Sequence, residues 1–303
     1  MDSQAVKDYA LSLGFTKVGI AEAISGEEAQ RLQDWLDRGF HADMAWMANP
    51  KRQDIRQMLP GVKSVISLAL NYYTPHLHQN DRAKISRYGW GRDYHKVLGK
   101  KLQKLADWLI AQTGCGARYY VDTAPIAEKA WAERAGIGWI GKHSNLITKD
   151  YGSWLFLGEV LTTLELQPDR RHRQYCGTCT RCISACPTQA IVAPFVVDAR
   201  KCIAYHTIEN RSETLPPEIV PHLQNWVAGC DICQDVCPWN QRFAQVTPIG
   251  EFQPYSANLN PPIQDLIELT PAQWEQRFTA SALRRIKLKQ WHRNAKAVQN
   301  TQD

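Results

Sequence analysis

The sequence predicts an α+β protein in three parts: a mixed α/β domain over residues 1–165, a small cysteine-rich domain over 166–245 and a short helical extension over 246–303. Helical and β-rich runs alternate through the first part, and eight of the nine cysteines fall between positions 176 and 237. The third part reverses its charge, since residues 251–276 contain no Lys or Arg and residues 277–302 contain no acid. Helices packed on a sheet, followed by a domain with little apolar core, are therefore expected.

The first part opens with a helix, because Val6, Ala10 and Leu13 recur at helical spacing. The run VKSVISLAL at 62–70 is typical of a buried strand. Leucines at steps of four, three and four then predict a helix that begins near Tyr94 and ends by Gly114.

The rest of the first part continues the alternation. Residues 117–121 read as a strand that stops at Asp122, and residues 126–135 read as a helix halted by Gly136. Residues 154–164 complete the domain with another apolar strand or pair of strands. The fold class of this part is mixed, with helices on a sheet.

Composition narrows the class of protein. At 44% apolar and 22% charged residues, the 303-residue chain is too apolar for disorder, and its net charge of +6 is mild. No run reaches the roughly 18 apolar residues that a membrane span needs. The N-terminus has an acid at position 2 in place of the basic start of a secretory signal. We therefore expect a cytoplasmic protein without a membrane partner.

The cysteine spacing is the strongest signal. Disulfides do not persist in a reducing compartment, so clustered cysteines indicate metal ligands or redox groups. The first run is C-x2-C-x2-C-x3-C-P from position 176, and the second is C-x2-C-x3-C-P from position 230, with Cys202 lying upstream. This spacing matches the bacterial ferredoxin run, in which three thiolates hold one cubane and the fourth holds its neighbour. Paired zinc sites are the alternative, but they rarely pack three cysteines this closely.

Eight ligands predict a ferredoxin-like domain with two [4Fe–4S] clusters. In such a domain the last cysteine of each run binds the cluster of the other run, which we call the crossing rule. One cluster is then bound by the first cysteine set and the other by the second cysteine set. The first set is Cys176, Cys179, Cys182 and Cys237, and the second set is Cys186, Cys202, Cys230 and Cys233. A carrier of electrons alone does not need a first domain of about 165 residues, so an acceptor is expected there.

Asp122 is the candidate catalytic residue of the first domain. It ends a predicted strand, where a turn would present its carboxyl group at the sheet edge. Partial desolvation would raise the pKa of this carboxyl and let it donate a proton near neutral pH. The alternative, equally compatible with the local sequence, is a cap for the following helix.

Three further features have plain interpretations. The G-x-G-x-x-G run at 136–141 follows a helix, whereas a dinucleotide fingerprint must follow a strand, so a Gly-rich turn is preferred. The run from Asp93 to Gly99 is one residue too long for a cobalt-binding D-x-H-x-x-G motif, and Asp93 is read as a helix N-cap. The isolated Cys115 is read as an unremarkable thiol.

The chain resembles the epoxyqueuosine reductase family, iron–sulfur and cobalamin enzymes of queuosine synthesis in tRNA. The resemblance is carried by SRYGWGRDYH at 86–95, VDT at 121–123, AERAGIG at 132–138, the eight-cysteine pattern and RNA at 293–295. These stretches cover nearly the full length. Longer members continue into helical repeats beyond the position where this chain stops.

The resemblance implies that the first domain binds cobalamin without a protein histidine on cobalt and that Asp122 is the proton donor. Ser86 stands where other members carry cysteine, which argues against any role for a thiol there. Family analogy implies a monomer. The residues implied to contact cobalamin are Arg52, Ser86, Asp122, Trp139, His143, Leu146, Leu157 and Asp231.

The implied reaction is the last step of queuosine synthesis, the reduction of epoxyqueuosine to queuosine at the tRNA wobble position. Electrons would pass from an unidentified donor through the clusters to cobalamin. The basic, acid-free segment near the C-terminus is the expected phosphate-binding surface, although a basic helix is often only a solvated face. The expected tRNA contacts are Arg211, Arg284, Arg285, Lys287 and Arg293.

Two other functions remain open from the sequence. One is a cobalamin-dependent reductase of another substrate, such as a reductive dehalogenase, against which the basic tail and the lack of an export signal argue. The other is a two-cluster electron carrier without catalytic activity.

Overall fold

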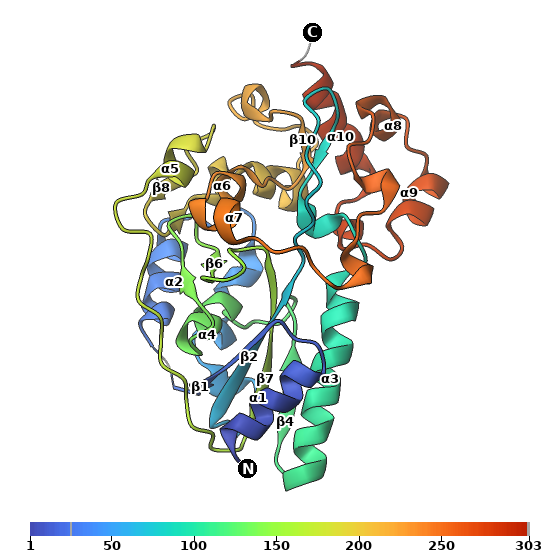
Figure 1. Cartoon of the computed structure of the whole chain (residues 1–303). Helices are drawn as coiled ribbons and strands as arrows, with labels where there is room; N and C mark the ends of the chain where they lie inside the picture. Colours follow the sequence, from blue (N-terminus) through green and yellow to red (C-terminus); the bar gives the residue numbers. More distant parts are fainter. Residues whose placement is uncertain (25, 302–303) are drawn as a thin grey trace.

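The computed structural model describes residues 1–24 and 26–301. Its helices and strands alternate through the first half and become short and irregular from residue 165 onward (Figure 1). The elements of the first half are α1 (Ser3–Ser12), β1 (Lys17–Glu22), α2 (Glu27–Asp37), β2 (Ser64–Asn71), β3 (Lys84–Ile85), α3 (Tyr94–Thr113), β4 (Ala117–Tyr120), α4 (Glu128–Arg134), β5 (Trp139–Ile140), β6 (Leu146–Ile147) and β7 (Leu155–Thr162). Those of the second half are α5 (Arg181–Ala185), β8 (Ile191–Ala193), β9 (Val196–Val197), β10 (Trp226–Ala228), α6 (Ile232–Asp235), α7 (Pro238–Phe243), α8 (Ile263–Ile267), α9 (Pro271–Phe278) and α10 (Leu288–Gln299).

The first domain is built on a four-stranded sheet in the order β1-β2-β7-β4. Every pairing in it is antiparallel, and the register places Ser67 of β2 and Tyr120 of β4 on either side of Glu159 of β7. All eight residues of β2 are buried, as expected for a central strand covered on both faces. The predicted mixed α/β class is confirmed for this part of the chain.

Helices cover the two faces of this sheet. On one face, Leu98 and Leu102 of α3 pack against Gly158 of β7, where an added Cβ would come within 2.7–2.8 Å of both leucines. On the other face lies α4, and a Cβ at Gly19 of β1 would overlap the carbonyl oxygen of Ala135. Glycine at these two strand positions therefore lets the helices approach the sheet closely.

Several predicted boundaries are confirmed. Asp93 caps α3 by accepting a hydrogen bond from the His95 N–H, and Gly114 ends the helix in a left-handed conformation (φ 68°). The predicted strand over 117–121 and the predicted helix over 126–135 are present as β4 and α4. The interpretation of Asp122 as a helix cap is wrong, because the N-cap of α4 is Ala127.

The cysteine-rich part contains only short helices and the β8-β9 pair. The C-terminal extension is helical, as predicted, and packs on a second hydrophobic core that includes Trp90, Ile203, Trp226 and Trp291. This core crosses the expected boundary at 245, so the extension is joined to the cluster-binding part by apolar burial. Among the described residues, no helix is both long and apolar enough to cross a membrane.

Candidate active site and cluster centres

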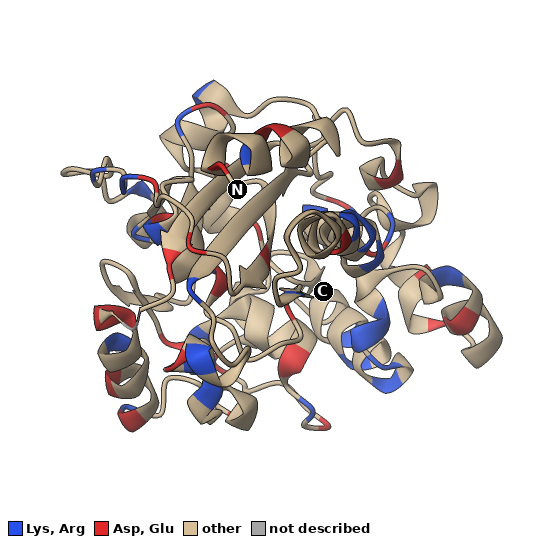
Figure 2. Cartoon of the chain, turned by 90° about the horizontal axis from the view of Figure 1, so that it is seen from below, with Lys and Arg blue, Asp and Glu red and all other residues tan. Residues whose placement is uncertain are grey.

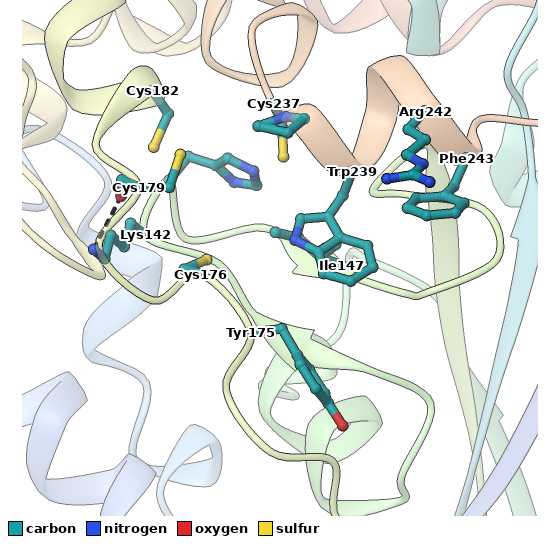
Figure 3. Close-up of a pocket in the computed structure, with 12 residues that line it drawn as sticks. Lys142, Ile147, Tyr175, Cys176, Cys179, Cys182, Cys237, Trp239, Arg242 and Phe243 are labelled. Carbon is teal, nitrogen blue, oxygen red and sulfur yellow. Dashed lines mark hydrogen bonds between the residues drawn. The ribbon is translucent and has the colours of Figure 1, made fainter.

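The first cysteine set surrounds a single cavity of about 360 Å³ (Figure 3). Cys182 projects from α5 and Cys237 is the N-cap of α7, and both are nearly buried. Within the described ranges, no three His, Cys, Asp or Glu side chains form a site for a single metal ion. The four thiols of this set instead line a common space, as the crossing rule predicts.

Two buried N–H groups test whether this cavity suits an iron–sulfur cluster. Nε2 of His143 and Nε1 of Trp139 are buried without a hydrogen-bond partner among the described residues. His143 Nδ1 accepts a hydrogen bond from the Asn145 N–H (3.2 Å), so in the neutral ring Nε2 carries the proton. Burial lowers the pKa of His143 to about 4, which keeps the ring neutral. Both groups are donors, and cluster or cysteine sulfurs would supply the missing acceptors.

Two of the residues expected to contact cobalamin, Trp139 and His143, lie beside this cavity. The structure places His143 in the lining of the cavity and packs Trp139 with Cys176 and Cys237. The Gly-rich run beside them is a tight hairpin, since a Cβ at Gly138 would overlap the carbonyl oxygen of Ile147. The close approach that the glycine permits is to the protein itself.

The second cysteine set also converges. Burial raises the pKa of Cys230 and Cys233, and the nearby Cys202 raises both further. Cys186 acts in the same direction on Cys202 and Cys233. The thiols of Cys202, Cys230 and Cys233 therefore lie near one another, with Cys186 close enough to act on two of them, and such a set suits a cationic cluster core.

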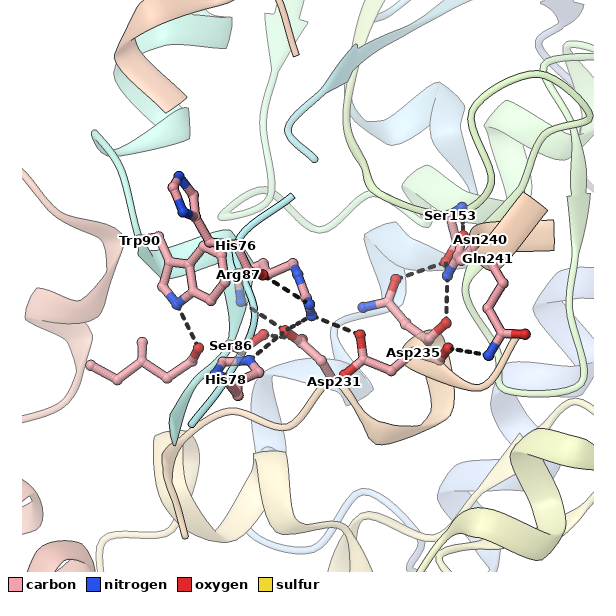
Figure 4. Close-up of polar contacts among 12 residues, drawn as sticks. His76, His78, Ser86, Arg87, Trp90, Ser153, Asp231, Asp235, Asn240 and Gln241 are labelled. Atoms are coloured by element: carbon pink, nitrogen blue, oxygen red, sulfur yellow. Dashed lines mark hydrogen bonds and ion pairs between the residues drawn. The ribbon is translucent and has the colours of Figure 1, made fainter. Parts of the chain in front are cut away.

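Ser86 and Asp231 come together beside the second cysteine set, as expected for two residues of one site. Ser86 Oγ donates a very short hydrogen bond to Asp231, and the Arg87 N–H donates to Asp231 Oδ2 (2.8 Å; Figure 4). Although complete burial acts to raise the pKa of Asp231, the nearby His78, whose Nε2 lies 3.9 Å from Oδ2, the charge of Arg87 and the hydrogen bond from Ser86 lower it. Arg87 also pairs with Asp235 at 2.7 Å. This network fixes the loop before α3 to the loop that follows Cys230.

Asp122 lies at the end of β4 in a left-handed conformation (φ 48°), which is strained for a residue with a side chain. Its side chain is 55% exposed, and its Oδ2 lies 3.1 Å from Nε2 of His95. Nδ1 of the same imidazole lies 2.7 Å from Asp93 Oδ1. The N-cap of α3 therefore also orients the histidine that meets Asp122.

The predicted rise in the pKa of Asp122 is wrong. Desolvation acts to raise this pKa, but the hydrogen bond and charge of His95 lower it below its usual value. For His95, desolvation acts to lower the pKa, and the two carboxylates outweigh it and raise the pKa to about 9. At neutral pH the proton shared by this pair therefore resides on His95.

Glu128, the first residue of α4, places a second acid against the loop that contains Asp122, here called the Asp122 loop (residues 121–127). Its Oε1 accepts the Asp122 N–H at 2.5 Å, and burial raises the pKa of Glu128 to about 8. Desolvation lowers the pKa of the neighbouring Lys129, and the charges of Cys233, Glu128, Asp122 and Cys202 act in the opposite direction. The start of α4 therefore lies between the second cysteine set and the Asp122 loop.

The rim of this site contains the predicted Arg52 and Arg285 and one residue that the sequence analysis missed. Arg52 donates to the Ile126 carbonyl oxygen at 3.0 Å, at the end of the Asp122 loop. The Arg285 guanidinium lies 5.2 Å from the ring centroid of Trp46, which is 45% exposed, and it pairs with Glu209 at 2.5 Å. An exposed Trp six residues before Arg52 was the available sequence signal for Trp46.

Leu146 and Leu157 meet in one apolar group with Ala69 and Ala132, also as expected for one site. Immediately along the sheet, Ser67 and Glu159 are fully buried, and neither side chain has a hydrogen-bond partner in the described structure. Burial raises the pKa of Glu159 well above its usual value. The sequence analysis did not identify this polar pair.

The predicted tRNA contacts differ in their surroundings. Arg284 pairs with Glu275 at 2.6 Å, whereas Lys287 is exposed. Arg211 donates to the Arg285 carbonyl oxygen at 3.2 Å. Arg293 is directed inward and donates to three backbone carbonyl oxygens, those of residues 206, 210 and 212. Burial lowers its pKa to about 10, and its three carbonyl partners hold the C-terminal helix to residues 206–212.

The α+β sheet domain and the two cysteine sets define an iron–sulfur oxidoreductase. A family model for a 4Fe-4S double cluster binding domain matches residues 175–240, and the model for epoxyqueuosine reductase QueG matches residues 52–123. The chain is 65% identical to the epoxyqueuosine reductase of Synechocystis sp. over 92% of its own length and 97% of that protein. It is 52% identical to the Gloeobacter violaceus enzyme over 97% of this chain and 94% of the relative. The chain belongs to the epoxyqueuosine reductase family.

Solved structures agree with this assignment. An epoxyqueuosine reductase crystallised with an epoxyqueuosine-modified tRNA-Tyr stem loop superposes with a TM-score of 0.91 and 30% identity, over 98% of this chain and 80% of that one. A Bacillus subtilis epoxyqueuosine reductase, whose catalytic aspartate loop is swung out of its active site, superposes with a TM-score of 0.89 and 28% identity, over 98% of this chain and 81% of that one. The chain is accordingly a reductase with a double 4Fe-4S cluster domain.

Proposed function

We propose that this protein reduces epoxyqueuosine to queuosine in tRNA, the last step of queuosine synthesis, using two [4Fe–4S] clusters and cobalamin. The observation that supports this proposal is the Asp122–His95 pair, a proton-bearing group whose loop leads into α4, where Lys129 lies near enough to Cys202 and Cys233 for their charges to affect its pKa. An electron source and a proton source would thus lie on either side of the start of α4. Membership of the family argues against an electron carrier without activity and favours this substrate over an organohalide.

The residues present suit cobalamin. The residues that would hold it are Arg52, Ser86, Leu146, Leu157 and Asp231. Leu146 and Leu157 share one apolar group, Ser86 donates to Asp231 beside Cys230, and Arg52 donates to Ile126 of the Asp122 loop. The unpartnered oxygens of Ser67 and Glu159 beside Leu157 would accept hydrogen bonds from a ligand rich in amide groups. Neither nitrogen of His95 is free to ligate cobalt, since each faces a carboxylate. When bound, cobalamin would supply the reduced cobalt that opens the epoxide.

Residues of the chain itself then hold and transfer the proton. Opening an epoxide expels an alkoxide, which is a poor leaving group unless it is protonated as it forms. His95 is protonated at neutral pH and donates to Asp122 Oδ2, so the carboxyl group relays a proton from the imidazole to the substrate oxygen. The strained backbone at Asp122 presents this carboxyl on a loop, consistent with the catalytic aspartate loop of the Bacillus subtilis relative, which is swung out of its active site. Asp93 and Glu128 hold the imidazole and the loop in place.

The tRNA would approach over Arg285, Trp46 and Lys287. Arg285 and Lys287 offer charge to phosphates, and an exposed indole offers a surface on which an unpaired base can stack. A base splayed from the anticodon loop would reach Asp122 past this rim.

The test is a turnover assay with the anaerobically reconstituted protein, dithionite and tRNA that carries epoxyqueuosine. We expect nucleoside mass spectrometry to show queuosine, and no conversion by protein that contains both clusters and cobalamin would refute the proposal. Because dithionite replaces the physiological donor, this result does not depend on how electrons are delivered in the cell.

A further inference from the structure

The cavity of the first cysteine set is bordered by aromatic and basic side chains. Tyr175, Trp239, Arg242 and Phe243 line it, and Arg181 directly precedes Cys182 on α5 (Figure 3). Lys149 joins the group, with its Nζ 4.4 Å from the Tyr175 ring centroid. We call these six residues the cationic face. Lys149, Tyr175, Arg181 and Arg242 are exposed.

The positive charge of this face is not neutralised. Among the described residues, neither Arg181 nor Arg242 nor Lys149 forms an ion pair, and no carboxylate lines the cavity. Arg181 reaches only the neutral Gln241 Oε1 at 3.5 Å, and Arg242 lies over the Phe243 ring at 5.4 Å. Acidic and basic residues are mixed over the molecule as a whole (Figure 2). An unpaired basic area beside a redox centre therefore indicates an acidic partner.

The aromatic members connect this surface to the sulfurs. The rings of Tyr175 and Trp239 lie 5.0 and 4.8 Å from that of Trp139, which packs against Cys176 and Cys237. Trp239 in turn stacks on Phe243 at 5.3 Å. A protein seated on the exposed edge of Tyr175 would thus be separated from the first cluster by little more than one layer of side chains.

The face is separate from the surface proposed for tRNA. In Figure 1, α5 and α7 lie on one side of the molecule, and α9 and α10, which flank Arg285 and Lys287, lie on the other. The basic residues of that surface are partly neutralised, since Arg284 and Arg285 pair with Glu275 and Glu209. An RNA on the cationic face would lie over the first cysteine set, whose cavity lining does not include Asp122 or His95.

We propose that the cationic face is the docking site for a small acidic protein that carries one electron at a time. This inference rests on the proposed function. The reduced carrier loses one electron to the oxidised [4Fe–4S] cluster of the first cysteine set, and that electron passes to the cluster of the second set. Two such transfers and two protons convert one epoxide into an alkene and water. The partner binds by its carboxylates to Arg181, Arg242 and Lys149, around a contact with Tyr175.

The test compares holoprotein variants in which the sign of two charges is reversed. Arg181→Glu with Arg242→Glu alters the face, and Lys100→Glu with Lys104→Glu makes the same change in charge at two exposed positions on α3. Reduced flavodoxin, an acidic flavoprotein that donates single electrons, serves as the probe, and dithionite serves as a small-molecule donor. The rate of cluster reduction is followed by stopped-flow absorption at low and high salt, after iron analysis has confirmed both clusters in each variant.

At low salt, the face variant should be reduced by flavodoxin at least about tenfold more slowly than the parent, with a flatter salt dependence. The α3 variant should match the parent, and dithionite should reduce all three equally. Flavodoxin rates that are equal in the face variant and the parent would overturn the proposal. Loss of tRNA stem-loop affinity in the face variant, with unchanged flavodoxin rates, would likewise overturn it and assign the surface to RNA.

If Arg181→Glu prevents cluster assembly, Lys149→Glu with Arg242→Glu tests the same face without a change next to Cys182. A failure of the proposed function would give a different result, because dithionite-reduced parent protein would then leave epoxyqueuosine unchanged.

Discussion

Charge is handled in opposite ways at the Asp122 loop and in the cavity of the first cysteine set. At the Asp122 loop, His95 lies between two carboxylates, and each polar group has a charged or hydrogen-bonded neighbour. In the cavity, the N–H groups of His143 and Trp139 have no partner in the described part of the chain. A polar network that is complete within the protein stores and moves a proton, whereas unpaired donors around thiols favour a ligand that supplies acceptors.

The largest effect is expected when the carboxyl relay is removed. Asp122→Asn keeps the shape of the side chain but loses the group that receives the His95 proton, so kcat should fall by about 10²–10⁴-fold. Iron content and the cobalamin spectrum should not change. Asp150→Asn, at an exposed aspartate paired with Lys17, is the matched control and should keep full activity. Full activity in the Asp122→Asn enzyme would show that Asp122 does not relay the proton of His95.

The next effect concerns stability at the C-terminal helix. Arg293→Ala removes the Arg293 donor from the carbonyl oxygens of residues 206 and 212, and from that of residue 210, which keeps the Gln290 amide. Thermal or urea unfolding should therefore show a loss of about 1–3 kcal/mol. Lys287→Ala, at an exposed position on the same segment, should leave stability unchanged and reduce the salt dependence of tRNA binding by about one phosphate contact. A stable Arg293→Ala protein with weakened tRNA binding would show that Arg293 is instead a direct contact.

The relay also predicts the pH dependence of turnover. The pKa of His95 is raised to about 9, so the pair holds its proton below that pH and loses it above. With dithionite as donor, the rate should be level between pH 6 and 8, fall to about half near pH 9 and then fall about tenfold for each further pH unit. The groups that face His95 are Asp93, Tyr94 and Asp122, with Glu128 and Arg285 acting through Asp122. A rate that rises through pH 9 would contradict a proton held on His95.

The same linkage acts on folding. Because the pKa of His95 in the folded protein lies above its unfolded value, its contribution to stability is complete below about pH 6.5 and is lost as pH rises through 9.

The smallest effect is expected in the cavity of the first cysteine set. His143→Leu removes one N–H donor, and a hydrogen bond of about 0.5–1.5 kcal/mol corresponds to roughly 20–60 mV in a one-electron couple. The reduction potential of the first cluster should become more negative by that amount, as measured by redox titration with electron paramagnetic resonance, while the second cluster keeps its potential. His222→Leu, at an exposed histidine, is the control. Equal potentials in His143→Leu and the parent would show that the imidazole does not contact the cluster.

What the sequence predicts well is what short-range chemistry determines. The cysteine sets follow from ligand spacing, and the Asp93 cap and Gly114 stop follow from local backbone preferences. Local sequence patterns cannot predict the His95–Asp122 pair, because it joins residues 27 positions apart, one in α3 and one after β4. For the same reason the sequence predicts the wrong direction for the pKa of Asp122.

The partners of Arg293 also could not be predicted from the local sequence. Its position in an acid-free segment predicts a surface contact, but its partners are backbone carbonyl oxygens in a distant loop. Ser67 and Glu159 face one another only through the register of β2 and β7, which a single strand pattern does not specify. Pairings of this kind require the folded chain.

The account depends on two cysteine sets that each hold a cluster and serve one cobalamin pocket. The most direct measurement is the iron and cobalt content of anaerobically purified protein after reconstitution with iron, sulfide and cobalamin. The account predicts eight iron atoms, as two [4Fe–4S] clusters, and one cobalt atom per chain. Zinc in place of iron, or iron without any retained cobalt, would contradict it.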